Sequence, residues 1–407
     1  MSSLSIAPFF PWSRMVVTGQ SVSEEADLAV VDLRPDRRYA PLCHLCGQKA
    51  GRVCSHQVRA VRDLDLASAR VQLRLSYRKV YCPACRAVVV EELEPVVPWQ
   101  RVTRRLAACI HQLCAVMTVQ DVAAHFGLNW KTVKDIDKAF LQERYAPAEL
   151  GELRVLAVDE FSLRKGRHYV TVVIDYETGR VLHVAEGNRS ESLASFFGKL
   201  NDRQKAGIEA IAMDMWDPYI KAVRECVPHV KIVFDLFHAV QAFSRIIDEV
   251  RLAEYRKASE QDREVIKGSK WLLLKTPQAL RQSEREHLDR LLKLNSVIAT
   301  VMILKDQLRR LWRSDSRQQV ARAMAEWCAL ARRVGHGKVE RFARRLEHYG
   351  YGILNHCDYP IHTSKLEGIN NKIKVIKRRA YGFHDLDYFA LKIHQAFDPE
   401  NRSLFGR

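Results

Sequence analysis

Three acidic residues in distant parts of the chain lie in settings that suit metal-ion chemistry. Asp159 follows the apolar segment 155–158, Asp214 follows the apolar segment 208–213, and Glu367 lies inside a basic segment. Asp214 follows Asp159 by 55 residues, and Glu367 follows Asp214 by 153 residues. Divalent cations are hard ions that prefer oxygen ligands, and a pair of them can activate the attacking and leaving oxygens of a phosphodiester. The three carboxylates therefore predict a phosphoryl-transfer site with two Mg²⁺ ions, for which Mn²⁺ could substitute.

Two Cys-x2-Cys pairs predict a second, structural metal site. The four thiols belong to Cys43, Cys46, Cys82 and Cys85. Two such pairs, each on a tight turn, can close a tetrahedral zinc site, and the interval between them fits a β-hairpin. Cys54 and His56 are possible substitute ligands, and the alternative is four free thiols in two unrelated turns. Metal ligation is preferred to disulfides because the sequence shows no secretion signal.

The charge of the chain indicates a polyanionic partner. The 407 residues carry a formal net charge of +17, and the pI is near 9.5. Backbone phosphates supply most non-specific affinity for nucleic acids, so double-stranded DNA is the expected partner. Residues 49–86 contain nine Lys and Arg against two Asp and Glu, which favours DNA contact by the zinc module over a merely solvated charged face. No apolar run approaches the ~20 residues that span a membrane, so we expect a cytoplasmic protein.

Residues 118–137 have the pattern of a helix-turn-helix. The first helix has an apolar stripe that includes Val122 and Phe126, Gly127 ends it, and Asn129 can cap the next helix. Val133 and Ile136 would face inward on the second helix. The residues left to face a DNA groove are Trp130, Lys131, Thr132 and Lys134. An ordinary helical hairpin is the alternative.

The order of elements after residue 153 predicts an α/β fold with a ribonuclease-H-like core. Alternation and turn residues indicate strands at 155–158, 169–174 and 181–184, joined by turns at 165–167 and 177–179. A helix near 191–200, a strand at 208–213, a helix near 217–226, a strand at 230–234 and a helix from about 236 follow. Asp159 and Asp214 would then end two central strands, and Glu367 would lie on a C-terminal helix beside them. Residues 240–350 read as helical.

Other polar residues near these strands have competing interpretations. Glu160 should point to the face opposite Asp159, and Asp175 suits a turn. His238, three residues after Asp235, would position the scissile phosphate or a water held by a metal ion, but Asp235 can equally form a local hydrogen bond at the helix start. Trp216 can stack on an unpaired base, although core packing is favoured. The alternative for Asp159 and Asp214 is that both are ordinary strand-end carboxylates.

The segment 364–379 predicts a basic helix around one carboxylate. It contains six basic residues and a single acidic residue, Glu367. Ile369, Ile373 and Ile376 keep apolar spacing, and the basic residues left for DNA are Lys372, Lys374, Lys377 and Arg378. A lone carboxylate on so cationic a helix fits a metal ligand beside phosphate clamps, whereas a solvated basic face would leave Glu367 as an ordinary helix charge.

Together these segments resemble bacterial insertion-sequence DDE transposases of the ISL-three type. The resemblance runs from the cysteine pairs to the C-terminal helix, and its motifs are Val-Asp-Glu-Phe161, Met-Asp-Met-Trp-Asp-Pro-Tyr219, Phe-Asp-Leu-Phe-His238, Glu-Gly-Ile-Asn-Asn-Lys-Ile-Lys374 and Arg-Arg-Ala-Tyr-Gly-Phe383. It implies a zinc finger, a helix-turn-helix and a ribonuclease-H-like catalytic domain that a helical insertion interrupts. It also implies that Asp159, Asp214 and Glu367 form the metal-binding triad. The segment before Glu367, Thr363-Ser-Lys-Leu, departs from the Asn that the family often has there.

The expected organisation and activity follow from this resemblance. The expected parts are a zinc-binding module at 1–98, a helix-turn-helix at 99–150, a first core segment at 151–240, a helical insertion at 241–355 and a last core segment at 356–407. The expected activity is binding of terminal inverted repeats, cleavage of transposon ends and strand transfer into target DNA, in the bacterial nucleoid. Pairing two DNA ends implies a homodimer or a larger assembly. The alternatives are a non-catalytic DNA-binding regulator and a structure-specific nuclease of the same fold.

Overall fold

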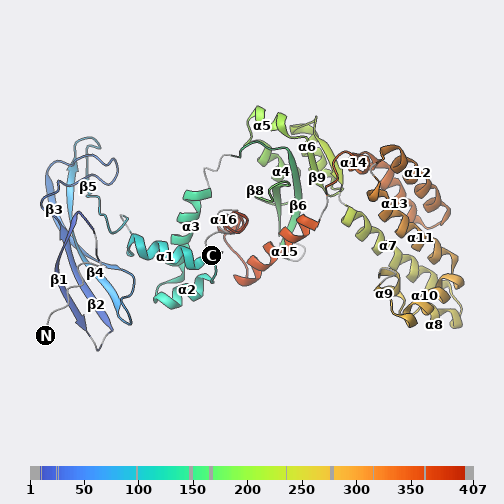
Figure 1. Cartoon of the computed structure of the whole chain (residues 1–407), viewed down its shortest axis with the longest axis horizontal. Coiled ribbons are helices and arrows are strands. Elements are labelled where there is room, and N and C mark those ends of the chain that lie inside the picture. The colour runs from blue at the N-terminus through green and yellow to red at the C-terminus, as the bar shows by residue number, and fades with distance from the viewer. Residues whose placement is uncertain are drawn as a thin grey trace. The chain divides into compact units, whose positions relative to one another are not determined.

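The computed structural model describes residues 10, 12–23, 25, 27–97, 100–145, 150–164, 168–234, 236–275, 279–314, 316–361 and 364–398. The chain divides into two compact units, Met1–Ala146 and Pro147–Arg407. Each unit contains a β-sheet and a set of helices, which Figure 1 labels in chain order. Within the described ranges, no helix combines the length and the apolar character that crossing a membrane requires.

The first unit begins with a five-stranded sheet. Its strands are β1 (Met15–Ser23), β2 (Leu28–Pro35), β3 (Val53–Arg62), β4 (Arg70–Cys82) and β5 (Ala87–Val90). They lie in the order β1-β2-β4-β3, with β5 also paired to β4. On β4 the side chains of Val71, Leu73 and Leu75 alternate with more exposed residues and are buried in the module's core. The antiparallel pair β3–β4 is the hairpin expected between the two cysteine pairs.

Three helices complete the first unit. They are α1 (Arg104–Cys114), α2 (Val119–Phe126) and α3 (Trp130–Tyr145). Gly127 adopts a left-handed conformation (φ 62°) and ends α2, and the Asn129 side chain accepts a hydrogen bond of 2.8 Å from the backbone N–H of Lys131. Val133 and Ile136 are buried against α1 and α2. The predicted helix–turn–helix geometry is therefore confirmed at its turn and in its packing.

The second unit is built on another five-stranded sheet. Its strands are β6 (Val155–Arg164), β7 (His168–Asp175), β8 (Val181–Glu186), β9 (Ala210–Met213) and β10 (Lys231–Phe234), in the order β10-β9-β6-β7-β8. The first three strands form an antiparallel meander, whereas β9 and β10 run parallel to β6. The strands predicted from the sequence are confirmed. Gly179 (φ 75°) closes the β7–β8 turn, and the turn predicted at 165–167 lies outside the described residues.

Helices cover both faces of this sheet. On one face, Leu156, Val158 and Met213 pack against α4 (Ser190–Phe197) and α6 (Asp217–Cys226), near the short helix α5 (Asp202–Gly207). On the other face, Ala157, Phe161 and Ala212 pack against α15 (Ser364–Arg379) and α16 (Leu386–Phe397). Figure 1 shows the sheet between these two sets of helices. Residues of odd number on β6 therefore face α15, and Asp159 is one of them.

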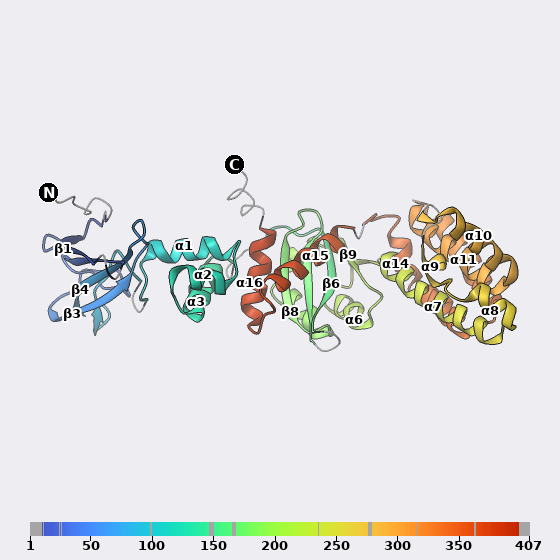
Figure 2. The ribbon, with the colours of Figure 1, turned by 90° about the horizontal axis from the view of Figure 1, so that it is seen from below.

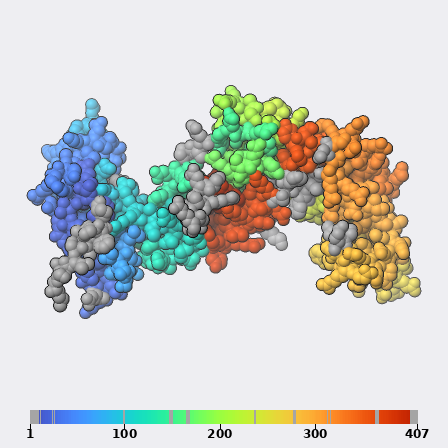
Figure 3. Space-filling view, in the orientation of Figure 1, coloured from blue at the N-terminus to red at the C-terminus, as the bar shows by residue number. Residues whose placement is uncertain are grey.

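A helical bundle separates β10 from α15 in the chain. Its elements are α7 (Leu236–Lys257), α8 (Glu260–Ile266), α9 (Lys270–Leu274), α10 (Gln282–Leu294), α11 (Ser296–Arg310), the 3-10 turn η3 (Leu311–Arg313), α12 (Arg317–Arg333), α13 (Gly337–His348) and α14 (Gly350–Asn355). The bundle has its own apolar core, which includes Phe243, Trp327 and Phe342. Figure 2 shows α7 leading away from the sheet, and Figure 3 shows the bundle as a lobe coloured yellow to orange. The helix α7 runs without interruption through residue 240, where the first core segment was expected to end and the insertion to begin.

Candidate active site

The pairing register of the sheet places Asp159 and Asp214 side by side. Parallel strands β6 and β9 pair Val155 with Ala210 and Ala157 with Ala212, so each partner on β9 lies 55 residues after its partner on β6. Asp159 and Asp214 have the same separation, so they lie at one level, two residues past the last β6–β9 pair. Asp214 directly follows β9, as predicted, but β6 continues to Arg164 because it stays paired with β7, so the prediction that Asp159 ends its strand is wrong. Side chains alternate between the two faces of a strand, and Ala157 on β6 and Ala212 on β9 face α15. Asp159 and Asp214, two residues further on, therefore lie on the same face. The separation of 55 residues in the sequence is therefore a consequence of the register.

His238 completes a group of three potential ligands with these carboxylates. One ligand atom from each of Asp159, Asp214 and His238 lies within 4.8 Å of the other two. His238 is in the first turn of α7, and its Nδ1 atom lies 2.5 Å from Oδ2 of Asp214. All three side chains are partly buried. The first turn of α7 thus brings His238 to the two carboxylates, whereas Asp235 lies outside the described residues.

Asn370 connects α15 to the same site. Its Nδ2 donates a hydrogen bond of 2.5 Å to Oδ2 of Asp159, and the backbone N–H of Glu160 donates one of 2.7 Å to Oδ1 of Asp159. Asn370 was not among the site residues predicted from the sequence. It lies three residues after Glu367, so both residues project from one side of the helix, and that spacing is the signal that would have identified it.

The electrostatics of Asp159 fit a site for a cation. Burial raises the pKa of Asp159 to about 6, and the negative charge of Asp214 acts in the same direction. His238 and the hydrogen bonds from Asn370 and from the backbone of Glu160 lower that pKa, but they do not cancel the rise. Two carboxylates and an imidazole that converge in a partly buried site form a donor set suited to a divalent metal ion.

Glu367 is placed differently from the two aspartates. It lies in the first turn of α15, and its side chain is exposed. Within the described part of the chain, the carboxylate cluster contains Asp159, Asp214 and His238 but not Glu367. The structure therefore brings together two members of the predicted triad, and the third lies one helical turn before Asn370. Thr363, the first residue of the segment that departs from the family's usual pattern, lies outside the described residues.

Two other acidic residues have the positions that the sequence predicted. Asp175 accepts hydrogen bonds of 2.9 Å from the backbone N–H of Glu177 and of 2.6 Å from the Thr178 hydroxyl, which confirms it as a turn residue. Glu160 accepts a hydrogen bond of 2.7 Å from Asn188, on the opposite side of β6 from Asp159. Neither carboxylate belongs to the metal-ligand cluster.

A small cavity of about 180 Å³ extends from the carboxylates to the helical bundle. Its lining includes Asp159, Asp214, Trp216, Arg245 of α7 and Arg345 of α13. The Arg345 guanidinium donates a hydrogen bond of 2.6 Å to the Met215 carbonyl. The Trp216 ring is 43% exposed, and its Nε1 donates to the Asn188 carbonyl, so this ring lines the cavity and is not buried in the core. The two arginines were missed because nothing in their local sequence relates them to Asp214.

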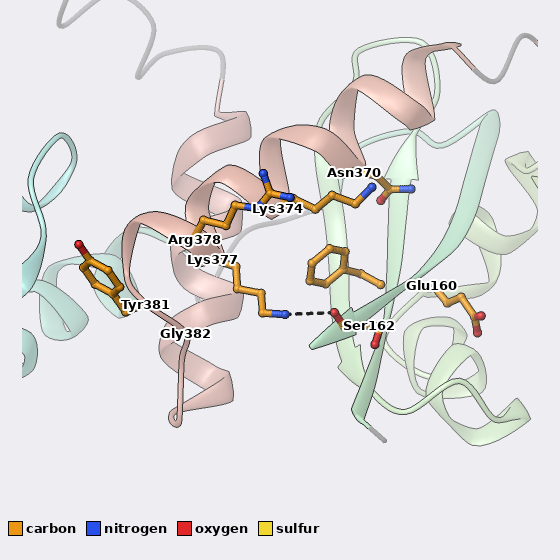
Figure 4. A pocket seen from close by; sticks show the side chains of 9 residues that line it. Glu160, Ser162, Asn370, Lys374, Lys377, Arg378, Tyr381 and Gly382 are labelled. Carbon is orange, nitrogen blue, oxygen red and sulfur yellow. Dashed lines mark hydrogen bonds between the residues drawn. The ribbon is translucent and has the colours of Figure 1, made fainter. Parts of the chain in front are cut away.

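A larger basic groove of about 630 Å³ lies between α15 and β6. Lys374, Lys377 and Arg378 line it together with Glu160, Phe161 and Ser162, as Figure 4 shows. The Lys377 ammonium donates a hydrogen bond of 3.3 Å to the Ser162 carbonyl, and Asn370 lies at the end of the groove nearest Asp159. Lys372 instead donates to the Ala396 carbonyl and lies over the Phe397 ring of α16. Three of the four cations predicted on this helix therefore share one groove.

The four cysteines converge in the first unit. Their sulfur atoms lie within 4.8 Å of one another, with Cys43 3.8 Å from Cys85 and Cys46 3.6 Å from Cys82. Zn–S bonds of about 2.3 Å in a tetrahedron require sulfur atoms about 3.8 Å apart. Cys54 is exposed and outside this cluster. The spacing of the thiols therefore fits one structural zinc ion.

The pKa values of these thiols also fit a metal site. Burial opposes ionisation of Cys43, but the backbone N–H groups of Cys46 and Leu45 and the neighbouring thiols lower its pKa to about 7. Interactions with Cys46, followed by burial, raise the pKa of Cys85 to about 12. In the protein alone, Cys43 therefore ionises more readily and Cys85 less readily than an ordinary thiol. A cation bound by the cluster would favour the thiolate form of both.

The helix-turn-helix presents its predicted DNA-binding side chains to solvent. Trp130, Lys131 and Thr132 are exposed at the start of α3, and Lys134 is partly exposed. No acidic residue lies in the first turn of this helix, so its positive dipole end adds to the charge of Lys131. The arrangement suits contact with the phosphates and base edges of a DNA groove.

Known family models match both units of the chain. A model described as a transposase, of the DDE class in ISL3 elements, matches residues 156–393. A second model, the helix-turn-helix domain of transposase family ISL3, matches residues 91–141. These matches place the chain among insertion-sequence transposases that have a DDE domain and a helix-turn-helix domain.

Curated relatives agree with these models. The chain is 40% identical over 364 residues to the transposase for insertion sequence element IS1001 of Bordetella parapertussis, covering 89% of this chain and 90% of that protein. It is 24% identical over 384 residues to the transposase for insertion sequence element IS1557 of Mycobacterium tuberculosis, covering 87% of this chain and 85% of that protein. The chain therefore belongs to the ISL3 family of transposases.

Proposed function

We propose that this protein binds the terminal inverted repeats of its own insertion sequence, cleaves the transposon ends and joins them to target DNA. The observation that carries the proposal is the shared register level of Asp159 and Asp214, with His238 beside them. The sheet order β10-β9-β6-β7-β8 supports a ribonuclease-H-like core, and the family membership supports the substrate class. Two bound Mg²⁺ ions would stabilise the charge that develops on the attacking and leaving oxygens.

In this proposal each residue near the site has a separate task. Asp159, Asp214 and Glu367 hold the metal ions, and Asn370 orients the Asp159 carboxylate through its hydrogen bond. His238 fixes the rotamer of Asp214, because its Nδ1 lies 2.5 Å from Oδ2. Lys374, Lys377 and Arg378 bind phosphates of the DNA that enters along the groove. Arg245 and Arg345 supply positive charge on the side of the helical bundle.

The remaining parts of the chain recognise and assemble the DNA ends. The zinc module at 1–98 and the helix-turn-helix at 99–150 bind the repeats, and residues 241–355 interrupt a catalytic domain formed by 151–240 and 356–407. Since two ends must be cut and joined together, a homodimer or larger assembly acts on them. The division of the chain after residue 146 and the exposed residues of α3 in the first unit support this assignment.

A cleavage and joining assay separates this proposal from its rivals. A duplex that carries the terminal repeat bordering the gene is incubated with Mg²⁺, and a pre-cut duplex with a free 3′-hydroxyl is offered together with plasmid DNA. A transposase nicks the first and joins the second to the plasmid. A structure-specific nuclease would give nicks without joined products, and a non-catalytic regulator would give neither.

Lys131→Ala is expected to weaken binding to the repeat duplex by about tenfold and to reduce the slope of log affinity against log salt by about 1. The reason is that Lys131 is exposed at the positive end of α3 and would neutralise one phosphate. The measurement is fluorescence anisotropy at several salt concentrations. Lys221→Ala is the matched control, since Lys221 lies on α6 and pairs with Glu225. If both variants bind alike, recognition does not use α3.

A further inference from the structure

The helix α15 ends in a turn that is unusual for its residue type. Tyr381 has a φ of 53°, followed by Gly382 with a φ of 109°. The backbone N–H of Tyr381 donates to the Arg378 carbonyl, and that of Gly382 donates to the Lys377 carbonyl, both at 3.0 Å. Helices that end in this way usually place glycine at the first left-handed position, because a side chain there is strained. A bulky aromatic residue in this conformation points to a functional role.

The Tyr381 ring is also the most exposed large apolar side chain in the described residues. It is 93% exposed, whereas the next, Trp271, is 67% exposed. The turn itself is anchored, because the Phe383 ring packs 4.7 Å from Phe389 and 5.9 Å from Tyr388. The backbone on both sides of Tyr381 is therefore held by α15 and by the core, while the ring faces solvent.

The exposed ring stands at one end of the basic groove. Tyr381 and Gly382 line the groove together with Lys374, Lys377 and Arg378, as Figure 4 shows. Lys374 and Arg378 are one helical turn apart, about 6 Å along the axis. The opposite end of the groove is at Asn370, which contacts Asp159. A row of cations therefore leads from the carboxylate site to a single exposed aromatic ring.

We propose that Tyr381 stacks on an unpaired base of a DNA strand whose phosphates lie along Lys374, Lys377 and Arg378. Grooves that bind single strands combine cations for the backbone with aromatic rings for the base faces, which a paired duplex keeps covered. Tyr381 follows Asn370 by nine residues of α15, about 14 Å, and two residues of the turn, so the stacked base lies roughly 15 Å, or about five nucleotides, from the site. The inference rests on the proposed function, because it takes the groove to carry the strand that the carboxylates process.

The test compares two labelled oligomers in buffer without divalent metal ions, so that no cleavage intervenes. One is (dT)12, and the other has the same phosphates but abasic sugars at its six central positions. The wild-type protein is expected to prefer (dT)12, and Tyr381→Ala to lower affinity for (dT)12 about tenfold without changing affinity for the abasic oligomer. Tyr381→Phe keeps the ring and should bind as the wild type does. Trp271→Ala is the control for loss of an exposed aromatic side chain.

A second measurement locates the contact directly. A (dT)12 strand with one 5-iodouridine is irradiated with the wild-type protein, and the cross-linked peptide is expected to contain Tyr381. Equal loss of affinity for both oligomers in Tyr381→Ala, or a preference for bases that disappears in Trp216→Ala but not in Tyr381→Ala, overturns the proposal. These binding measurements need no catalysis, so they can fail while the cleavage assay succeeds. If instead base stacking by Tyr381 is observed and cleavage is not, only the proposed function is overturned.

Discussion

Asp159→Ala and Asp214→Ala are each expected to lower Mg²⁺-dependent cleavage of the repeat duplex by at least about 1000-fold, with binding of the uncut duplex retained. The two carboxylates lie at one level on adjacent parallel strands, and either alone leaves a bound cation short of charge and of fixed geometry. The measurement is the initial rate of nicking by wild type and variants at saturating DNA. Asp159→Asn and Asp214→Asn, which keep the shape and remove the charge, should be almost as defective.

Nearby carboxylates serve as controls for this prediction. Asp175→Asn should cleave nearly as the wild type does, because Asp175 only closes the β7–β8 turn. Glu160→Gln should have an intermediate effect, since Glu160 is adjacent to the site but bonds to Asn188 on the other side of the strand. Wild-type rates in both Asp159→Ala and Asp214→Ala would show that the chain does not use this site.

The identity of the third ligand is decided by the same assay. We expect Glu367→Ala to be inactive, and Asn370→Ala to retain part of the activity because Asn370 only orients Asp159. Normal cleavage by Glu367→Ala together with an inactive His238→Ala would make His238 the third ligand. The helix α15 would then bind DNA and orient Asp159 through Asn370, without supplying a metal ligand.

Cys82→Ser is expected to release about one zinc ion per chain and to unfold the sheet of the first unit. Binding of structural zinc has an apparent free energy of about 10–16 kcal/mol, which exceeds the stability of a small domain. Cys82 is buried at the end of β4, so its loss removes both a ligand and the end of the central strand. Metal analysis of the purified protein measures the first effect, and limited proteolysis of the full chain measures the second.

The exposed Cys54 provides the matched control. Cys54→Ser removes a thiol from the same module but from outside the cluster, so zinc content and protease resistance should stay at wild-type values. The second unit should keep its fold in Cys82→Ser, because its cores contain no residue of the first unit. Wild-type protein without zinc would refute the prediction.

Local patterns in the sequence predicted most of the elements that position the site. The end of α2 at Gly127 and the cap at Asn129 are each determined by neighbours along the chain, so the sequence was sufficient to predict them. The apolar strands that precede Asp159 and Asp214 were equally clear. The turn role of Asp175 followed from the Thr-Gly sequence beside it.

The details of the site depend on tertiary contacts that no local pattern encodes. Arg345 reaches the Met215 carbonyl from 130 residues further along the chain, and its own helix shows only ordinary amphipathic spacing. Trp216 was expected in the core, but the hydrogen bond of its indole to Asn188 holds the ring at the cavity wall. The exposure of Glu367 depends on how α15 is rotated over the sheet, which the burial of Ile369 and Ile373 determines.

The helical bundle leaves and rejoins the sheet at a single strand. The chain departs just after β10, at the start of α7, and α14 returns to that strand, where Asn355 donates a hydrogen bond of 2.9 Å to the Ile232 carbonyl. A side chain at Gly352 would overlap the Phe234 ring, since a Cβ atom there would lie 2.3 Å from it. Because α7 and α14 both adjoin β10, the bundle between them can be lengthened, shortened or exchanged during evolution without a change in the order of the strands. The constraint on such exchange falls on the two junctions, where His238 on one side and Gly352 on the other must keep their places.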